Sequence, residues 1–89
     1  MYSVMHYVYL LQSVKSGKIY TGQTSDLRRR IFEHKSGNTI TTAKMLPVRL
    51  VFYEAFLDKH DAVRREMYLK TSKGKSTVRM MLQSSLNLK

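Results

Sequence analysis

The chain has 89 residues, the size of one small domain, so we expect any chemistry to fit on a single core rather than on the separate domains of a multidomain enzyme. Hydrophobic residues make up 43% of the chain, too many for a disordered basic tail. The 16 Lys and Arg residues against 6 Asp and Glu give a net charge of +10, which indicates a polyanionic partner, most often nucleic acid. We therefore expect residues 1–89 to form one domain.

The first part of the chain predicts a β-hairpin followed by a helix. Residues 5–12 (MHYVYLLQ) and 18–22 (KIYTG) are rich in aromatic and β-branched residues, and the turn-forming SVKSG joins them. Apolar side chains lie on both faces of the first strand, which is typical of a central strand. The following TSD can cap a helix, and Leu27 and Ile31 then recur four residues apart. We expect this helix over residues 26–35.

The middle of the chain predicts a loop, a third strand and a second helix. Residues 37–47 are polar and threonine-rich, and we expect a connecting loop that is mobile or contacts a ligand. Residues 49–56 are β-branched and aromatic, and Pro47 precedes them at a position where a strand loses no hydrogen-bond donor. Asp58 is typical of the cap of a helix, expected over residues 59–71.

The C-terminal part predicts a short last helix. Ser76 is the expected cap, and Val78, Met81 and Leu82 are the expected apolar face. The order of elements is then β-β-α-β-α-α. This order predicts an α+β fold in which helices flank a small three-stranded antiparallel sheet.

Three ionisable residues lie where an amphipathic helix would carry apolar ones. Arg30 and His34 share the stripe of Leu27 and Ile31, and Glu66 lies on the apolar stripe of the second helix. Burying an unpaired charge costs several kcal/mol, so each needs a partner or a function. The structural explanation is an Arg30–Glu66 ion pair between the two helices, and it predicts that Glu66→Ala destabilises the fold by several kcal/mol.

The functional explanation combines these residues with two strand tyrosines, Tyr9 and Tyr20. Phosphodiester hydrolysis needs a deprotonated water, stabilisation of negative charge on phosphoryl oxygens, and protonation of the leaving oxygen. A tyrosine acts as a base only if a nearby cation lowers its pKa, and we expect Arg30 to do so. A single carboxylate, with water and substrate phosphate, is enough to bind Mg²⁺ or Mn²⁺.

The order and spacing of these motifs resemble the GIY-YIG nuclease superfamily, and within it the small stand-alone bacterial proteins. The first motif reads YVY at residues 7–9 and the second YTG at residues 20–22. The Leu-x-x-Arg-x-x-x-His pattern occupies residues 27–34, and AVRRE at residues 62–66 resembles the segment with the metal-binding glutamate. Many members carry a later asparagine, for which Asn87 comes too far along the chain.

The resemblance implies a role for each of six residues. These are Tyr9 as the general base or water-positioning tyrosine, Tyr20 as its partner near the phosphate, Arg30 as the phosphate clamp, His34 as an orienting or proton-relaying group, Glu66 as the ligand of Mg²⁺ or Mn²⁺, and Gly22 as the close-approach glycine. The implied function is a divalent-metal-dependent DNA endonuclease or nickase that acts on branched or flapped DNA in repair or recombination. A protein partner for targeting is also implied.

A second function hypothesis is a non-catalytic basic nucleic-acid-binding module that keeps the same fold. Its basis is the net charge of +10 and the absence of an added DNA-reading domain. Phosphate contacts by lysines give affinity without sequence preference and make binding fall steeply with salt. The lysines that we expect to contact nucleic acid are Lys18, Lys35, Lys44, Lys70, Lys73 and Lys75.

The composition also indicates the cellular compartment of the protein. The chain has no cysteine, which excludes disulfides, thiolate nucleophiles and cysteine-based zinc sites and fits a reducing cytoplasm. It also lacks the roughly 20 apolar residues of a spanning helix and the features of a signal peptide. We expect a cytoplasmic protein that does not bind membranes.

Overall fold

A computed structural model describes residues 4–86 of the chain. The elements follow in the order expected from the sequence, with one additional short helix. They are β1 (His6–Ser13), β2 (Ile19–Thr24), α1 (Leu27–Lys35), α2 (Ile40–Ala43), β3 (Val48–Phe56), α3 (Lys59–Leu69) and α4 (Ser72–Met81). The predicted strands and long helices are therefore present, with bounds that differ by a few residues.

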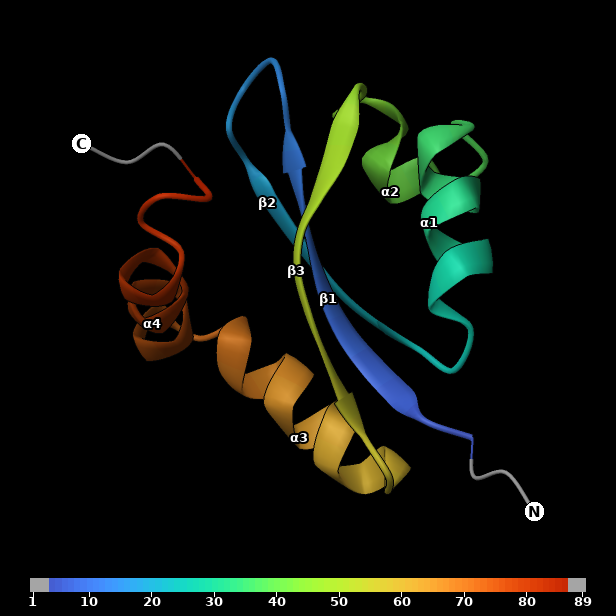
Figure 1. Cartoon of the computed structure of the whole chain (residues 1–89). Coiled ribbons are helices and arrows are strands. Elements are labelled where there is room, and N and C mark those ends of the chain that lie inside the picture. The colour runs from blue at the N-terminus through green and yellow to red at the C-terminus, as the bar shows by residue number, and fades with distance from the viewer. Residues whose placement is uncertain (1–3, 87–89) are drawn as a thin grey trace.

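The three strands form one antiparallel sheet in the order β2-β1-β3. The first strand is central, as its two apolar faces predicted. Val8 and Leu10 pack with α3 and α4 on one face, while Tyr9 and Leu11 belong to a second apolar cluster on the other. Figure 1 shows α1 and α2 together on one side of the sheet and α3 and α4 on the opposite side.

The loop expected over residues 37–47 is a correction, because it contains the helix α2. Threonine is a poor helix former, so composition alone favours a loop there. The side chain of Thr42 is nevertheless completely buried and hydrogen-bonds to His34 of α1. This tertiary contact explains why the segment is helical.

The start of the last helix is a second correction. Ser76 is not its cap, because α4 begins at Ser72 and the side chain of Thr71 accepts a hydrogen bond from the backbone N–H of Gly74. The second long helix correspondingly ends at Leu69, before Thr71. The Lys-Gly-Lys sequence resembles a turn, but Gly74 lies inside the helix and is buried.

Candidate active site

Tyr9 lies at the centre of the sheet, on the face that α1 covers. Its side chain is 1% exposed and it pairs directly with Gly22 of β2 across the ladder. A methyl group at Gly22 would overlap Cζ and Oη of the Tyr9 ring. The glycine is therefore needed because the tyrosine ring lies over the neighbouring strand.

We expect Gly22→Ala to lower the free energy of unfolding by about 2 kcal/mol or more, because the new methyl group has to displace a buried ring. Urea denaturation followed by circular dichroism measures the change. Thr21→Ala is the matched control, because Thr21 is the adjacent residue on the opposite face of β2. Equal losses in the two variants would contradict the close-approach role of Gly22.

A buried chain of hydrogen bonds extends from Tyr9 through His34 to Thr42. Tyr9 Oη lies 2.8 Å from His34 Nε2, and His34 Nδ1 lies 2.7 Å from Thr42 Oγ1. His34 and Thr42 are each 0% exposed. Both nitrogens of the imidazole therefore have a partner, so the orientation of the ring is fixed.

Thr42 is the member of this hydrogen-bond chain that the sequence did not reveal. No resemblance or spacing singled it out, and the threonine-rich segment around it favours a loop. The sequence indicated only that the polar residues 37–47 are mobile or contact a ligand. In the structure, Thr42 of this segment contacts His34.

Tyr20 completes an aromatic cluster on this face. Its ring centroid lies 6.2 Å from that of Tyr9 and 5.1 Å from that of His34. Tyr20 comes from the edge strand β2 and is only half-buried. It is therefore the member of the cluster that lies nearest to solvent.

Arg30 of α1 lies beside Tyr9 but does not lower its pKa below the usual value. Burial raises the pKa of Tyr9 to about 12, and this effect outweighs the opposite effect of the Arg30 guanidinium. The expectation that Arg30 makes Tyr9 an ionised base is therefore wrong for the protein alone. At neutral pH the phenol is protonated and donates or accepts a hydrogen bond.

His34 is shifted in the direction that keeps it neutral. Burial lowers the pKa of His34 below its usual value, and the positive charge of Arg30 lowers it further. A neutral imidazole has one nitrogen that accepts a hydrogen bond. When Nδ1–H donates to Thr42, Nε2 is free to accept the Tyr9 proton.

Glu66 lies on α3, which covers the opposite face of the sheet. Its carboxylate pairs with Lys70 Nζ at 3.0 Å, whereas Arg30 pairs with Glu33 at 2.9 Å. The expected ion pair between Arg30 and Glu66 does not form, so the structural explanation of these two residues is wrong. The structure brings Tyr9, Tyr20, Arg30 and His34 together, and within residues 4–86 no hydrogen bond or ion pair connects Glu66 to them.

The donor set for a metal ion is small. Within residues 4–86, no group of three His, Asp, Glu or Cys side chains is placed to bind a metal. Mg²⁺ and Mn²⁺ accept one carboxylate together with water and substrate phosphate. Glu66 fits this requirement, because its side chain is 21% exposed and its ion-pair partner Lys70 is 55% exposed.

The six lysines expected to bind nucleic acid lie in two groups. Lys18, Lys70 and Lys75 line a groove between β2 and α4, together with Arg79. The others do not line this groove; they are Lys35 at the end of α1, Lys44 after α2, and Lys73 on α4. The exposed cations therefore reach both sides of the sheet.

Asn87, which the sequence placed too late for the family's asparagine, lies outside residues 4–86. Within those residues, no helix has the length and apolar character needed to cross a membrane.

Comparison with known proteins extends over nearly all of these elements. Residues 5–79 match the family model described as the GIY-YIG catalytic domain. A UPF0213 protein of Staphylococcus saprophyticus is 39% identical over 67 residues, which cover 74% of this chain and 80% of that protein. A UPF0213 protein of Clostridium perfringens is 42% identical over 67 residues, with coverage of 74% and 71%.

A solved structure gives the same result. The solution NMR structure of the UPF0213 protein BH0048 from Bacillus halodurans matches with a TM-score of 0.57 and 34% identity, over 94% of each chain. This likeness confirms the α+β fold expected from the sequence. The matched range of the family model includes every residue of the candidate site, from Tyr9 to Glu66.

Proposed function

The chain belongs to the GIY-YIG catalytic domain family, and from this we propose that it is a nuclease that hydrolyses phosphodiester bonds of DNA with the help of a divalent metal ion. The observation that carries the proposal is the buried chain of hydrogen bonds from Tyr9 to His34 and Thr42. Any buried tyrosine hydroxyl needs one hydrogen-bond partner. Here that partner is an imidazole, a group that can take up a proton, and its second nitrogen is held by Thr42, which is the arrangement that a proton relay requires. Arg30 lies beside the first member of this chain.

We assign to Tyr9 the role of a proton relay. With its pKa at about 12, the phenol is protonated at neutral pH and is not an ionised base. As the attacking water loses a proton to Tyr9 Oη, the phenol gives its own proton to Nε2 of the neutral His34. The tyrosine then ends the step in the protonation state in which it began, and the imidazole carries the proton.

Thr42 is a positioning residue in this scheme. A hydrogen bond donated by His34 Nδ1–H to Thr42 Oγ1 selects the tautomer in which Nε2 accepts a proton. The positive charge that forms on His34 is offset by the developing negative charge of the phosphoryl oxygens. The hydroxyl of Thr42 thus acts on the reaction through the imidazole.

Arg30 and Glu66 supply the remaining functions. The side chain of Arg30 is 36% exposed at the side of the tyrosine cluster, where its guanidinium can bind the phosphoryl oxygens of the substrate. Glu66 would hold the metal ion, which when bound supplies positive charge that stabilises the attacking and leaving oxygens. Tyr20, at the exposed side of the cluster, would bind the phosphate next to Tyr9.

Branched or flapped DNA is the substrate that we propose, with roles in repair or recombination and with targeting by a protein partner. The binding-module hypothesis stays as the alternative, because the net charge of +10 by itself predicts affinity for nucleic acid. The two hypotheses differ in turnover alone. Both predict binding that weakens steeply as the salt concentration rises.

Cleavage of labelled duplex, single-stranded and flapped DNA at low salt tests the proposal. We expect cleavage with Mg²⁺ or Mn²⁺ and none with EDTA, because the phosphoryl charge needs the metal ion. Flapped DNA is expected to be cleaved fastest. Tight, salt-sensitive binding without cleavage of any substrate in either metal would contradict the nuclease proposal and favour the binding module.

A further inference from the structure

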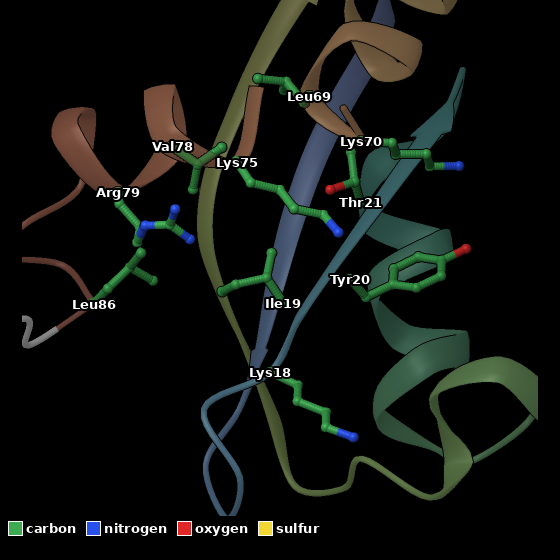
Figure 2. A pocket seen from close by; sticks show the side chains of 10 residues that line it. All are labelled: Lys18, Ile19, Tyr20, Thr21, Leu69, Lys70, Lys75, Val78, Arg79 and Leu86. Atoms are coloured by element: carbon green, nitrogen blue, oxygen red, sulfur yellow. The ribbon is translucent and has the colours of Figure 1, made fainter. Parts of the chain in front are cut away.

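A groove of about 510 Å³ runs between the edge strand β2 and the helix α4. Its position follows from the alternation of side chains along β2. Ile19 and Thr21 face α4, whereas Tyr20 between them faces α1. Figure 2 shows Lys75 and Arg79 extending from α4 toward Ile19 across this groove. The groove therefore lies on the face of the sheet opposite to Tyr9 and His34.

The charge of the groove is of one sign. Four cations line it, namely Lys18, Lys70, Lys75 and Arg79, and none of the described lining residues is acidic. Lys18, Lys75 and Arg79 have no ion-pair partner within residues 4–86. Cations without a protein partner, gathered at one hollow, are complementary to a chain of phosphates.

The floor of the groove is apolar. Leu69, Val78 and Leu86 contribute to it from the core, and Ile19 leaves 36% of its surface exposed. A surface for phosphates alone has no need of such a floor. An unpaired nucleotide, in contrast, presents an apolar base face next to its phosphate, and single-strand binding sites combine the same two features.

The wall that α4 provides is fixed in place by close packing. Gly74 is buried, and a methyl group there would overlap the backbone of Tyr68 and Leu69 in α3. The absence of a side chain at this position lets the two helices touch. Lys75, the next residue, therefore starts from a backbone that is packed against α3.

The groove also meets the candidate active site. Tyr20 contributes to its lining, and Lys70 at its rim pairs with Glu66. A strand lying in the groove would therefore pass Tyr20 and Lys70, the ion-pair partner of Glu66, at the edge of the sheet. This position joins the aromatic cluster on one face to the carboxylate on the other.

We infer that the groove between β2 and α4 binds an unpaired strand of nucleic acid, with its phosphates on Lys18, Lys75 and Arg79 and a base on Ile19. The inference rests on the proposed nuclease function, for which it supplies the place of the single-stranded arm. Duplex DNA would bind through its phosphates alone, because its bases are stacked and paired.

Fluorescence anisotropy in EDTA tests this inference without any cleavage. The probes are a short labelled oligothymidylate, an abasic strand with the same number of phosphates, and a blunt duplex. We expect the wild type to bind oligothymidylate about ten-fold tighter than the abasic strand. Ile19→Ala is expected to remove most of this difference while circular dichroism shows an unchanged fold.

The cationic rim is tested by the double variant Lys75→Gln/Arg79→Gln. It should weaken binding of both single-stranded probes and reduce the slope of log affinity against log salt by about 1.4, as expected for two lost phosphate contacts. Lys59→Gln is the matched control, because Lys59 is an exposed cation at the start of α3 outside the groove. It is expected to leave the base preference unchanged.

Three results would overturn the inference. The first is a wild type without preference for bases, and the second is a rim variant that behaves like Lys59→Gln. The third is competition by polyglutamate of equal charge that is as effective as competition by oligothymidylate, which would assign the groove to an acidic protein.

The nuclease proposal and this inference can fail separately. Groove binding without metal-dependent cleavage would refute the nuclease proposal alone. Cleavage together with normal binding by the groove variants would refute this inference alone.

Discussion

Tyr9→Phe is expected to lower the rate of cleavage about 1,000-fold while the affinity for DNA changes little. The substitution removes the hydroxyl that hydrogen-bonds to His34 Nε2, at 2.8 Å, and leaves the buried ring in place. Without it, the attacking water has no route for its proton into the chain that ends at Thr42. Single-turnover cleavage, with binding measured in EDTA, separates the two effects.

Tyr7→Phe is the matched control for this variant. Tyr7 lies two residues earlier on the same face of β1, and its ring packs edge-on against Tyr53 at 6.0 Å. Unlike the Tyr9 hydroxyl, its hydroxyl makes no hydrogen bond to His34. Cleavage by Tyr7→Phe should be close to that of the wild type. Equal losses in the two variants would contradict a specific role for the Tyr9 hydroxyl.

Thr42 provides a second readout of the same relay. Thr42→Val keeps the shape of the side chain but cannot accept the hydrogen bond from His34 Nδ1–H. We therefore expect the cleavage rate to fall about 10-fold. Thr42→Ser restores the hydroxyl and should recover most of the rate. A merely structural role would lower the melting temperature of the valine variant and leave its rate per folded molecule unchanged.

Glu66→Gln is the second prediction with a large effect, a loss of about 1,000-fold in metal-dependent cleavage. The amide has nearly the shape of the carboxylate but lacks its charge, so the charge stabilisation worth several kcal/mol that a bound metal ion provides is lost. The fold is expected to survive, because the pair that Glu66 makes with Lys70 is partly exposed to solvent, and i,i+4 pairs of this kind contribute little.

Metal binding gives a readout of Glu66 that does not depend on activity. Titration calorimetry with Mn²⁺ and bound DNA should show binding to the wild type that is lost in Glu66→Gln. Glu54→Gln is the control, because Glu54 of β3 is a comparably exposed carboxylate that pairs with Arg65 at 2.5 Å. Unchanged Mn²⁺ binding in Glu66→Gln would show that the metal ligand is another residue.

Much of the fold could be predicted because it depends on patterns local to each element. The two apolar faces of β1 predicted its central place, and Asp26 and Asp58 cap the helices that follow them. The tyrosines, Arg30 and His34 were found through their spacing, and the structure brings them to one face of the sheet.

The features that sequence reasoning missed depend on contacts between distant segments. The helix α2 forms where composition favours a loop, because Thr42 is buried against His34 eight residues earlier. Gly74 resembles a turn residue but serves the contact between α3 and α4. In both cases the local preference of the sequence is weaker than a tertiary contact.

The electrostatic predictions failed for a different reason. Charge pairing between Arg30 and Glu66 was plausible from their places on two apolar stripes, yet each has a nearer partner on its own helix. The pKa of Tyr9 depends on how deeply the ring is buried, which the sequence does not specify. Burial of the phenol turned out to outweigh the neighbouring cation.

The pH dependence of single-turnover cleavage by the wild type tests the relay through Tyr9, His34 and Thr42 most directly. Burial lowers the pKa of His34, so the imidazole is neutral above the usual value of about 6.5 and the rate should fall only below it. With the pKa of Tyr9 at about 12, the phenol stays protonated from pH 7 to pH 9, and we predict a flat rate there. A rate that rises ten-fold per pH unit over that range would show that the reaction requires a group to deprotonate first, as a phenolate base would, and would contradict the relay.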